Sequence, residues 1–294
     1  PGPAYGQGRF GLRQDVFHEA ESQRASAASA AVARVVGSAA LILPFAVVVV
    51  LWFVSTGLVA MLNHRLRQSF GRALIIAGVC AFGGLALLVL TSHSTAIWAV
   101  YASFLGGLLI WAWHEISFLT GAVAGSHREP CPEGASGWQR FSLATMALIH
   151  HEIAIAMTAA LLLSLAAVTV NATGAYAFVL LAIFRLSSKL NIYRGVPNMS
   201  DELLPAHLDY LKSYFGPRQL RSTLLLSIVA LLAIALYFGF AAVQANTAHE
   251  TVGAGLLCCL SLLAALEHFF FAIPFRDSRL WQWALGEPKE HKEI

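Results

Sequence analysis

Seven long apolar runs dominate this sequence, and they constrain its fold more than any other feature. A helix that crosses about 30 Å of hydrocarbon needs roughly 20 mostly apolar residues. The runs lie at about 35–62, 72–91, 95–118, 140–170, 172–193, 222–244 and 251–273. Only 12% of the residues are charged, whereas soluble domains carry about 25%. The sequence therefore predicts an all-α polytopic membrane protein with seven transmembrane helices.

The runs also suggest a division of the chain. Residues 1–34 are rich in Gly, Ala and Ser and contain no apolar run, which indicates an N-terminal tail that is flexible or lies on the surface. Residues 35–275 form the predicted seven-helix domain, and residues 276–294 form a cytoplasmic tail. The fourth run is too long to lie in hydrocarbon throughout, so its first turns are expected to project from the membrane.

Two patterns at the ends of the runs bear on how the chain lies in a membrane. The connections at 92–94, 171–175 and 245–250 contain no Lys or Arg, whereas the alternate connections and the C-terminal tail hold most of those after Arg34. Basic loops favour the cytoplasm, so we expect a periplasmic N-terminus and a cytoplasmic C-terminus. Four tryptophans near run ends suggest interfacial aromatic residues: Trp98, Trp138, Trp281 and Trp283. No basic stripe interleaved with aromatics predicts a nucleic-acid partner.

Ionisable residues interrupt four of the apolar runs, where charge is costly and marks a partner or a function. They are the pairs His114-Glu115, His151-Glu152, Arg185 with Lys189, and Glu267-His268. Each group lies toward the end of its run that we expect to face the cytoplasm. At 1.5 Å per helical residue they share a similar depth. Four helices are therefore expected to contribute to one polar layer.

Three interpretations of this layer remain open. In the first, Arg185 and Lys189, which share a helix face, neutralise the carboxylates in a buried ion-pair network. In the second, carboxylates and imidazoles hold a transition metal such as iron or zinc, as in di-iron bundles. The candidate metal ligands are Glu115, His151, Glu152, Glu202, His207, Glu267 and His268. The Glu-x-x-His spacing of soluble di-iron sites is absent, and the two cations would oppose a second positive centre.

The third interpretation is pigment binding. A neutral histidine in an apolar pocket can ligate the magnesium of a chlorin or the iron of a haem. The candidate ligands are His114 beside Trp111 and Trp113, His151, and His268 beside a run of three phenylalanines. No residue pattern indicates a nucleophile or another catalytic group, and no nucleotide fingerprint is present.

The long connection at 194–221 is expected to contain a short helix that begins at Ser200. Asp201 and Glu202 in its first turn would favour the helix dipole. Its apolar residues would let it lie on the membrane or cap the bundle, which would bring Glu202 and His207 within reach of the polar layer. A solvated surface helix is the favoured expectation.

The sequence contains an ordered set of short motifs between the third run and the long connection. They are Trp113-His-Glu-Ile-Ser-Phe-Leu-Thr-Gly121, Cys131-Pro132, Arg140-Phe141, His151-Glu152, Lys189-Leu-Asn-Ile-Tyr193, Gly195-Val-Pro-Asn198 and the Leu-Pro before His207. Each motif is weak alone, but their order is fairly specific. Together they resemble the PuhE family of photosynthetic complex assembly proteins from phototrophic bacteria, and the resemblance covers roughly residues 35–285.

This resemblance implies an assembly factor or accessory subunit for the reaction centre or light-harvesting complex, in the bacterial inner, intracytoplasmic membrane. Such a protein can bind or pass bacteriochlorophyll or hold a reaction-centre subunit. The family implies no catalytic residues. Two alternatives stay open: a membrane metalloenzyme of the oxygenase type acting on a tetrapyrrole, and a purely structural subunit. The missing Glu-x-x-His spacing and the adjacent cations favour the assembly role over the enzyme.

Overall fold

The computed structural model describes residues 42–59, 61, 70–199, 204–274, 280, 281 and 283. The chain divides into two units, residues 1–43 and 44–294, and only Ile42 and Leu43 of the first unit are described. The expected N-terminal tail at 1–34 lies outside the described residues, as does most of the expected C-terminal tail at 276–294. The account below concerns the second unit.

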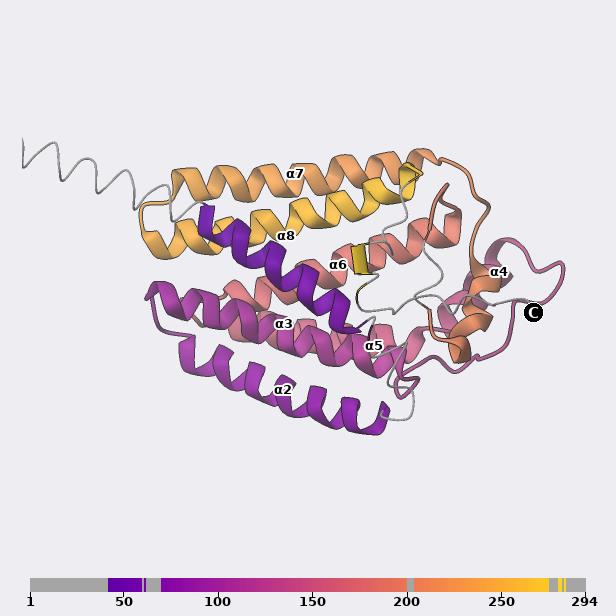
Figure 1. Ribbon diagram of the computed structural model, residues 1–294, viewed down its shortest axis with the longest axis horizontal. Helices are drawn as coiled ribbons and strands as arrows, with labels where there is room; N and C mark the ends of the chain where they lie inside the picture. Colours follow the sequence, from indigo (N-terminus) through magenta and orange to yellow (C-terminus); the bar gives the residue numbers. More distant parts are fainter. Residues whose placement is uncertain are drawn as a thin grey trace, which may run out of the picture. The chain divides into compact units, whose positions relative to one another are not determined.

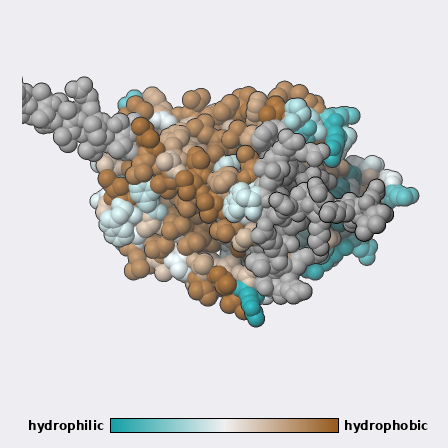
Figure 2. All heavy atoms as spheres, in the orientation of Figure 1, coloured by the Kyte–Doolittle hydropathy of each residue, from teal (hydrophilic) through white to brown (hydrophobic). Residues whose placement is uncertain are grey.

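Seven helices are long and apolar enough to cross a membrane. They are Ile42–Val59, α2 (Phe70–Thr91), α3 (Ile97–Leu119), α5 (Ile149–Ala166), α6 (Thr173–Arg194), α7 (Ser222–Gln244) and α8 (Ala248–Ala272). The described residues contain no strand. The predicted all-α fold with seven spanning helices is therefore confirmed. Figure 2 shows hydrophobic side chains over the spanning helices and hydrophilic ones gathered at the end that carries α4.

The fourth predicted run is not one helix. It is divided into α4 (Gly137–Met146) and α5, with Ala147 and Leu148 between them. The amide of Gly125 donates to the carbonyl of Ala147 at 3.0 Å, and the amide of His127 donates to that of Met146 at 3.3 Å. Amides of the preceding loop thus donate hydrogen bonds to carbonyls that have no helical partner at the break. The prediction of a continuous run was wrong, because the loop before α4 supplies these bonds.

Helix α3 lies between α2 and α6, and small residues allow close approach on both sides. A Cβ on Gly84 of α2 would lie 2.6 Å from the carbonyl oxygen of Gly106. A Cβ on Gly107 would overlap the backbone of Gly174 in α6. Such contacts favour association in a membrane, where apolar burial alone does not drive helices together. Figure 1 shows α2 beside α3, and α7 beside α8.

The C-terminal aromatics hold the first spanning helix. Trp281 is 3% exposed, and its indole Nε1–H donates to the Phe53 carbonyl at 3.0 Å. Its ring also meets that of Trp52, with centroids 5.3 Å apart. Trp281 is thus packed within the protein, whereas Trp98 and Trp138 are exposed, and the interfacial position of these tryptophans stays a prediction.

The long connection after α6 contains a 3₁₀ helix, η3 (Ala206–Tyr214). Its residues Leu208, Leu211 and Tyr214 are buried in a cluster with Phe118 and Ala147. This part of the connection caps the bundle, so the favoured expectation of a solvated helix was wrong. Ser200, Asp201 and Glu202 lie outside the described residues.

Candidate functional site

Four spanning helices bring their ionisable residues together in what we call the polar layer. Its members are His114, Glu115, His151, Glu152, Arg185, Lys189, Glu267 and His268. Glu115 lies four residues before the end of α3, which is about 6 Å along the axis. Arg185 lies nine residues before the end of α6, about 14 Å along its axis. The layer therefore lies within the spanning segments, below the end capped by η3.

Arg185 joins three helices. Its guanidinium lies 3.4 Å from the Glu115 carboxylate on α3 and 4.0 Å from the Glu267 carboxylate on α8. A planar guanidinium can form ion pairs with two carboxylates at once, and an ammonium group is less suited to this geometry. The side chains of Arg185 and Glu267 are 37% and 38% exposed, so this part of the layer is only half-enclosed by the chain.

Lys189 makes the second ion pair, between α6 and α5. Its Nζ donates to Glu152 Oε1 at 2.5 Å, and the two side chains are 17% and 27% exposed. The ammonium also lies 5.7 Å from the centroid of the Phe118 ring. Together the two cations reach three carboxylates on three other helices. The predicted ion-pair network of Arg185 and Lys189 with Glu115, Glu152 and Glu267 is therefore confirmed.

His268 on α8 is fully buried, and both of its ring nitrogens are bonded. Nδ1 lies 2.9 Å from the carbonyl oxygen of Ala264, and Nε2 lies 2.9 Å from the hydroxyl of Ser187 on α6. A carbonyl can only accept, so Nδ1 donates to Ala264. The second bond, between Nε2 and the Ser187 hydroxyl, ties α8 to α6.

His114 on α3 is 2% exposed, and its Nε2 lies 3.0 Å from the hydroxyl of Thr158 on α5. Its ring meets the rings of Trp113 and Phe178 edge to face, at centroid distances of 5.1 and 5.5 Å. Nδ1 has no hydrogen-bond partner among the described residues. The aromatic surroundings expected from the sequence are present for this histidine.

His151 on α5 differs from the other two. It is fully buried, and neither ring nitrogen has a hydrogen-bond partner within the described part of the chain. Its ring lies 4.7 Å from that of Phe118 and 6.5 Å from that of His114, centroid to centroid. Buried polar atoms are nearly always bonded, so His151, with two unbonded ring nitrogens, and His114, with one, have capacity left for a further partner among the described residues.

The remaining candidate metal ligands lie elsewhere or outside the description. His207 is on η3, where its ring lies 5.9 Å from that of Phe70 at the start of α2. Glu202 is not among the described residues. Within the described ranges no group of three or more His, Cys, Asp or Glu side chains is placed to hold a metal ion. The metal interpretation stays a prediction.

Sequence reasoning missed the residues that orient the polar layer. Thr158 and Ser187 supply the hydroxyls that hold His114 and His268. Arg140 on α4 donates to the Tyr214 carbonyl at 2.7 Å and lies over the Tyr193 ring at 4.3 Å, which fastens η3 to α6. Their hydroxyl groups, placed inside apolar helices, were the sequence feature that could have indicated this role. Sequence spacing alone does not show which histidine each hydroxyl contacts.

Tyr214 at the end of η3 links this cap to the preceding loop. Burial raises the pKa of its phenol, so the hydroxyl keeps its proton and donates to the Glu129 carbonyl at 3.1 Å. Ser213 accepts from the amide of Cys131 at 2.8 Å. Hydrogen bonds therefore join η3 to the loop that precedes α4.

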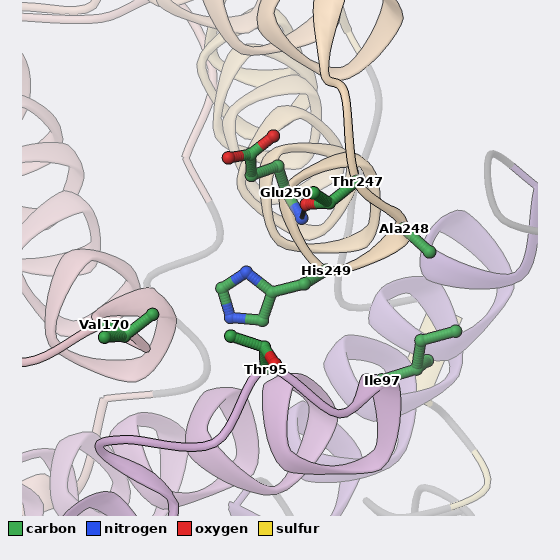
Figure 3. Close-up of a pocket in the computed structure, with 7 residues that line it drawn as sticks. All are labelled: Thr95, Ile97, Val170, Thr247, Ala248, His249 and Glu250. Atoms are coloured by element: carbon green, nitrogen blue, oxygen red, sulfur yellow. Dashed lines mark hydrogen bonds between the residues drawn. The ribbon is translucent and has the colours of Figure 1, made fainter.

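A hollow of about 390 Å³ lies at the other end of the helices (Figure 3). The imidazole of His249 extends there between Thr95 and Val170. Glu250 also lines it, but its carboxylate accepts from the Asn246 amide and Thr247 caps the Glu250 amide. These two bonds hold the start of α8, so the acidic group there has a structural role.

The chain was compared with known proteins. A family described as protein of unknown function (DUF3623) matches residues 38–292. A protein of Rhodobacter capsulatus, described as an uncharacterized 30.4 kDa protein in the puhA 5' region, is 32% identical over 249 residues, 82% of this chain and 90% of the relative. No solved structure is significantly similar. These matches confirm the resemblance seen in the ordered motifs, and the chain belongs to the DUF3623 family.

Proposed function

We propose that this chain is an accessory membrane protein of the photosynthetic apparatus that assists assembly of a reaction-centre or light-harvesting complex. The observation that carries the proposal is the relative described as lying in the puhA 5' region, which matches over 90% of its own length. The extent of the match argues that the two proteins share their whole membrane domain. The order of the family motifs, from Trp113 to His207, supports the same role.

The polar layer supports a holding role over a catalytic one. Arg185 and Lys189 each satisfy carboxylates on neighbouring helices, and His268 has both ring nitrogens bonded. Removing any one group leaves a charge or a buried acceptor without its partner. The layer therefore maintains a defined arrangement of α3, α5, α6 and α8, and such a rigid surface suits the positioning of another membrane subunit.

Pigment binding is a finer proposal, and the described conformation limits it. Among the three candidate histidines, only His151 has no described partner at either ring nitrogen. Its imidazole is fully enclosed, with Phe118 over it. A chlorin bound at His151 would therefore require the helices around it to separate.

The membrane placement is part of the same proposal. Lys and Arg gather at the end that carries α4 and η3, so we place that end in the cytoplasm and the chain in the bacterial inner membrane. Alkaline phosphatase fused within the 245–250 connection should be active, and a fusion within 119–136 should be inactive. The reverse pattern would overturn the orientation and leave the assembly role untouched.

The role is tested by deleting the gene in a phototrophic host and restoring it as the intact chain or as Lys189→Met. We expect deletion to lower the reaction-centre and light-harvesting absorbance of isolated membranes severalfold, and the intact chain to restore it. Immunoblotting checks that each protein accumulates. Unchanged absorbance after deletion would contradict the proposal. Absorption spectra and metal analysis of the purified protein separate pigment binding from the metalloenzyme alternative.

A further inference from the structure

A second hollow, of about 230 Å³, lies where the long connection joins α6 to α7. We call it the basic pocket, because two cationic side chains line it, Lys212 from η3 and Arg218 from the following turn. The rest of its wall is largely apolar and includes Ile192, Val196, Met199 and Phe215. Cationic groups over an apolar wall suit a ligand with a negatively charged head and an apolar body.

The position of the basic pocket matches such a ligand. Helix α6 ends at Arg194 and α7 begins at Ser222, and both are spanning helices. The pocket is lined by Ile192, near the end of α6, and by residues of the connection that leads to α7. Ile192, Val196 and Met199 also belong to a core cluster that includes Leu224 of α7. The apolar wall is therefore supported by packed helices.

Among the described residues, the charged side chains around the basic pocket are mainly positive. Arg194 and Arg221 are exposed on either side of the connection. Among the described residues, the acid nearest in sequence to Lys212 is Asp209, which pairs with it at 2.9 Å, but both side chains are more than a third exposed. Ion pairs of that kind contribute little. Arg218 is exposed and makes no ion pair with any described residue.

We propose that the basic pocket binds the phosphodiester headgroup of an anionic phospholipid. Lys212 and Arg218 contact the phosphate. The acyl chains lie along the exposed apolar side chains of α7, of which Leu225 is the first. Basic pockets at the ends of membrane helices hold anionic headgroups by this combination of charge and depth. This inference does not depend on the proposed assembly role.

Native mass spectrometry of the detergent-purified full chain tests the proposal with phosphatidylglycerol and phosphatidylcholine. We expect preferential retention of phosphatidylglycerol. Each basic side chain near a membrane surface is worth about fivefold in binding, so Arg218→Gln should weaken retention about fivefold and the Lys212→Gln/Arg218→Gln pair more than tenfold. Arg221→Gln is the matched control, because Arg221 is exposed on the same connection and does not line the pocket.

Three results would overturn the inference. Equal weakening by Arg221→Gln would show that only general surface charge acts. Equal retention of phosphatidylcholine and phosphatidylglycerol would show that the site does not distinguish the charge of the headgroup. Displacement of the lipid by inorganic phosphate at equal concentration would show a site for free phosphate. If the double variant loses its melting transition in detergent, the Arg218→Gln variant alone decides.

Discussion

The two halves of the spanning helices are held together by different interactions. In the tight half, defined by Gly84, Gly106, Gly107 and Gly174, backbones meet directly. In the charged half, defined by the polar layer, long side chains join the helices at distances such as 3.4 Å between Arg185 and Glu115. Helices α3 and α6 take part in both halves. One helix pair can therefore depend on shape at one end and on charge at the other.

The connections reinforce this contrast. Asn171, between α5 and α6, is 3% exposed, and its Nδ2–H donates to the Ala99 carbonyl at 2.9 Å. The tight half is thus closed by backbone carbonyls and small side chains. In the charged half, Lys189, Arg185 and two histidines supply the links, so changes there should act through unpaired groups more than through steric overlap.

The largest effect is expected in the tight half, from Gly107→Val. A Cβ at this position would overlap the Gly174 backbone, so α3 and α6 must separate. We expect a loss of about 3 kcal/mol or more in the free energy of unfolding, measured by denaturant titration in detergent. Gly83→Val is the matched control, because a Cβ there meets nothing within 4 Å. Similar losses in both variants would remove the distinction between the halves.

The next effect is expected from Lys189→Met in the charged half. This change leaves the Glu152 carboxylate, 27% exposed, without its cation. We expect a loss of about 2–3 kcal/mol, reduced from the fully buried case because the pair is partly open. Lys189→Met combined with Glu152→Gln should recover most of it. A double variant whose loss equals the sum of the single losses would show that the pair does not act as a unit.

Arg185→Met should have a smaller effect, of about 1–2 kcal/mol. Its side chain is 37% exposed, so part of the lost interaction is replaced by the surroundings. Arg185→Lys tests geometry separately, since a point charge cannot address Glu115 and Glu267 as a guanidinium does. Thermal melting in detergent measures both variants. A loss of stability larger than that of Lys189→Met would show that the Arg185 ion pairs stabilise the charged half more than their exposure suggests.

The smallest effect is expected from Ser187→Ala. It removes the hydroxyl bonded to His268 Nε2 and leaves a buried ring nitrogen without its partner, which costs about 1 kcal/mol. Ser164→Ala on α5 is the control, because its exposed hydroxyl bonds only to the Ala160 carbonyl of its own helix. The ring-nitrogen chemical shifts of His268 should move in the first variant only. Unchanged shifts would contradict the assigned bond.

Local sequence predicted much of this protein because a bilayer makes strict local demands. Each spanning helix needs its own apolar run, so seven were countable, and α7 matches the expected range of 222–244. Charged residues in such runs need partners, so Arg185 and Lys189 could be matched in advance with carboxylates on other helices. The break between α4 and α5 had no such local signal. It depends on amides of Gly125 and His127, which only folding brings there.

By itself, the sequence determined the all-α class, the seven spans and the family, because hydrophobic length and motif order are properties of consecutive residues. Only the tertiary structure decided which polar atoms are paired. Within the described residues, both ring nitrogens of His268 form hydrogen bonds, one ring nitrogen of His114 does, and neither ring nitrogen of His151 does. The three histidines look alike in sequence. They differ because a hydrogen bond needs a partner within about 3 Å, and that partner comes from another helix.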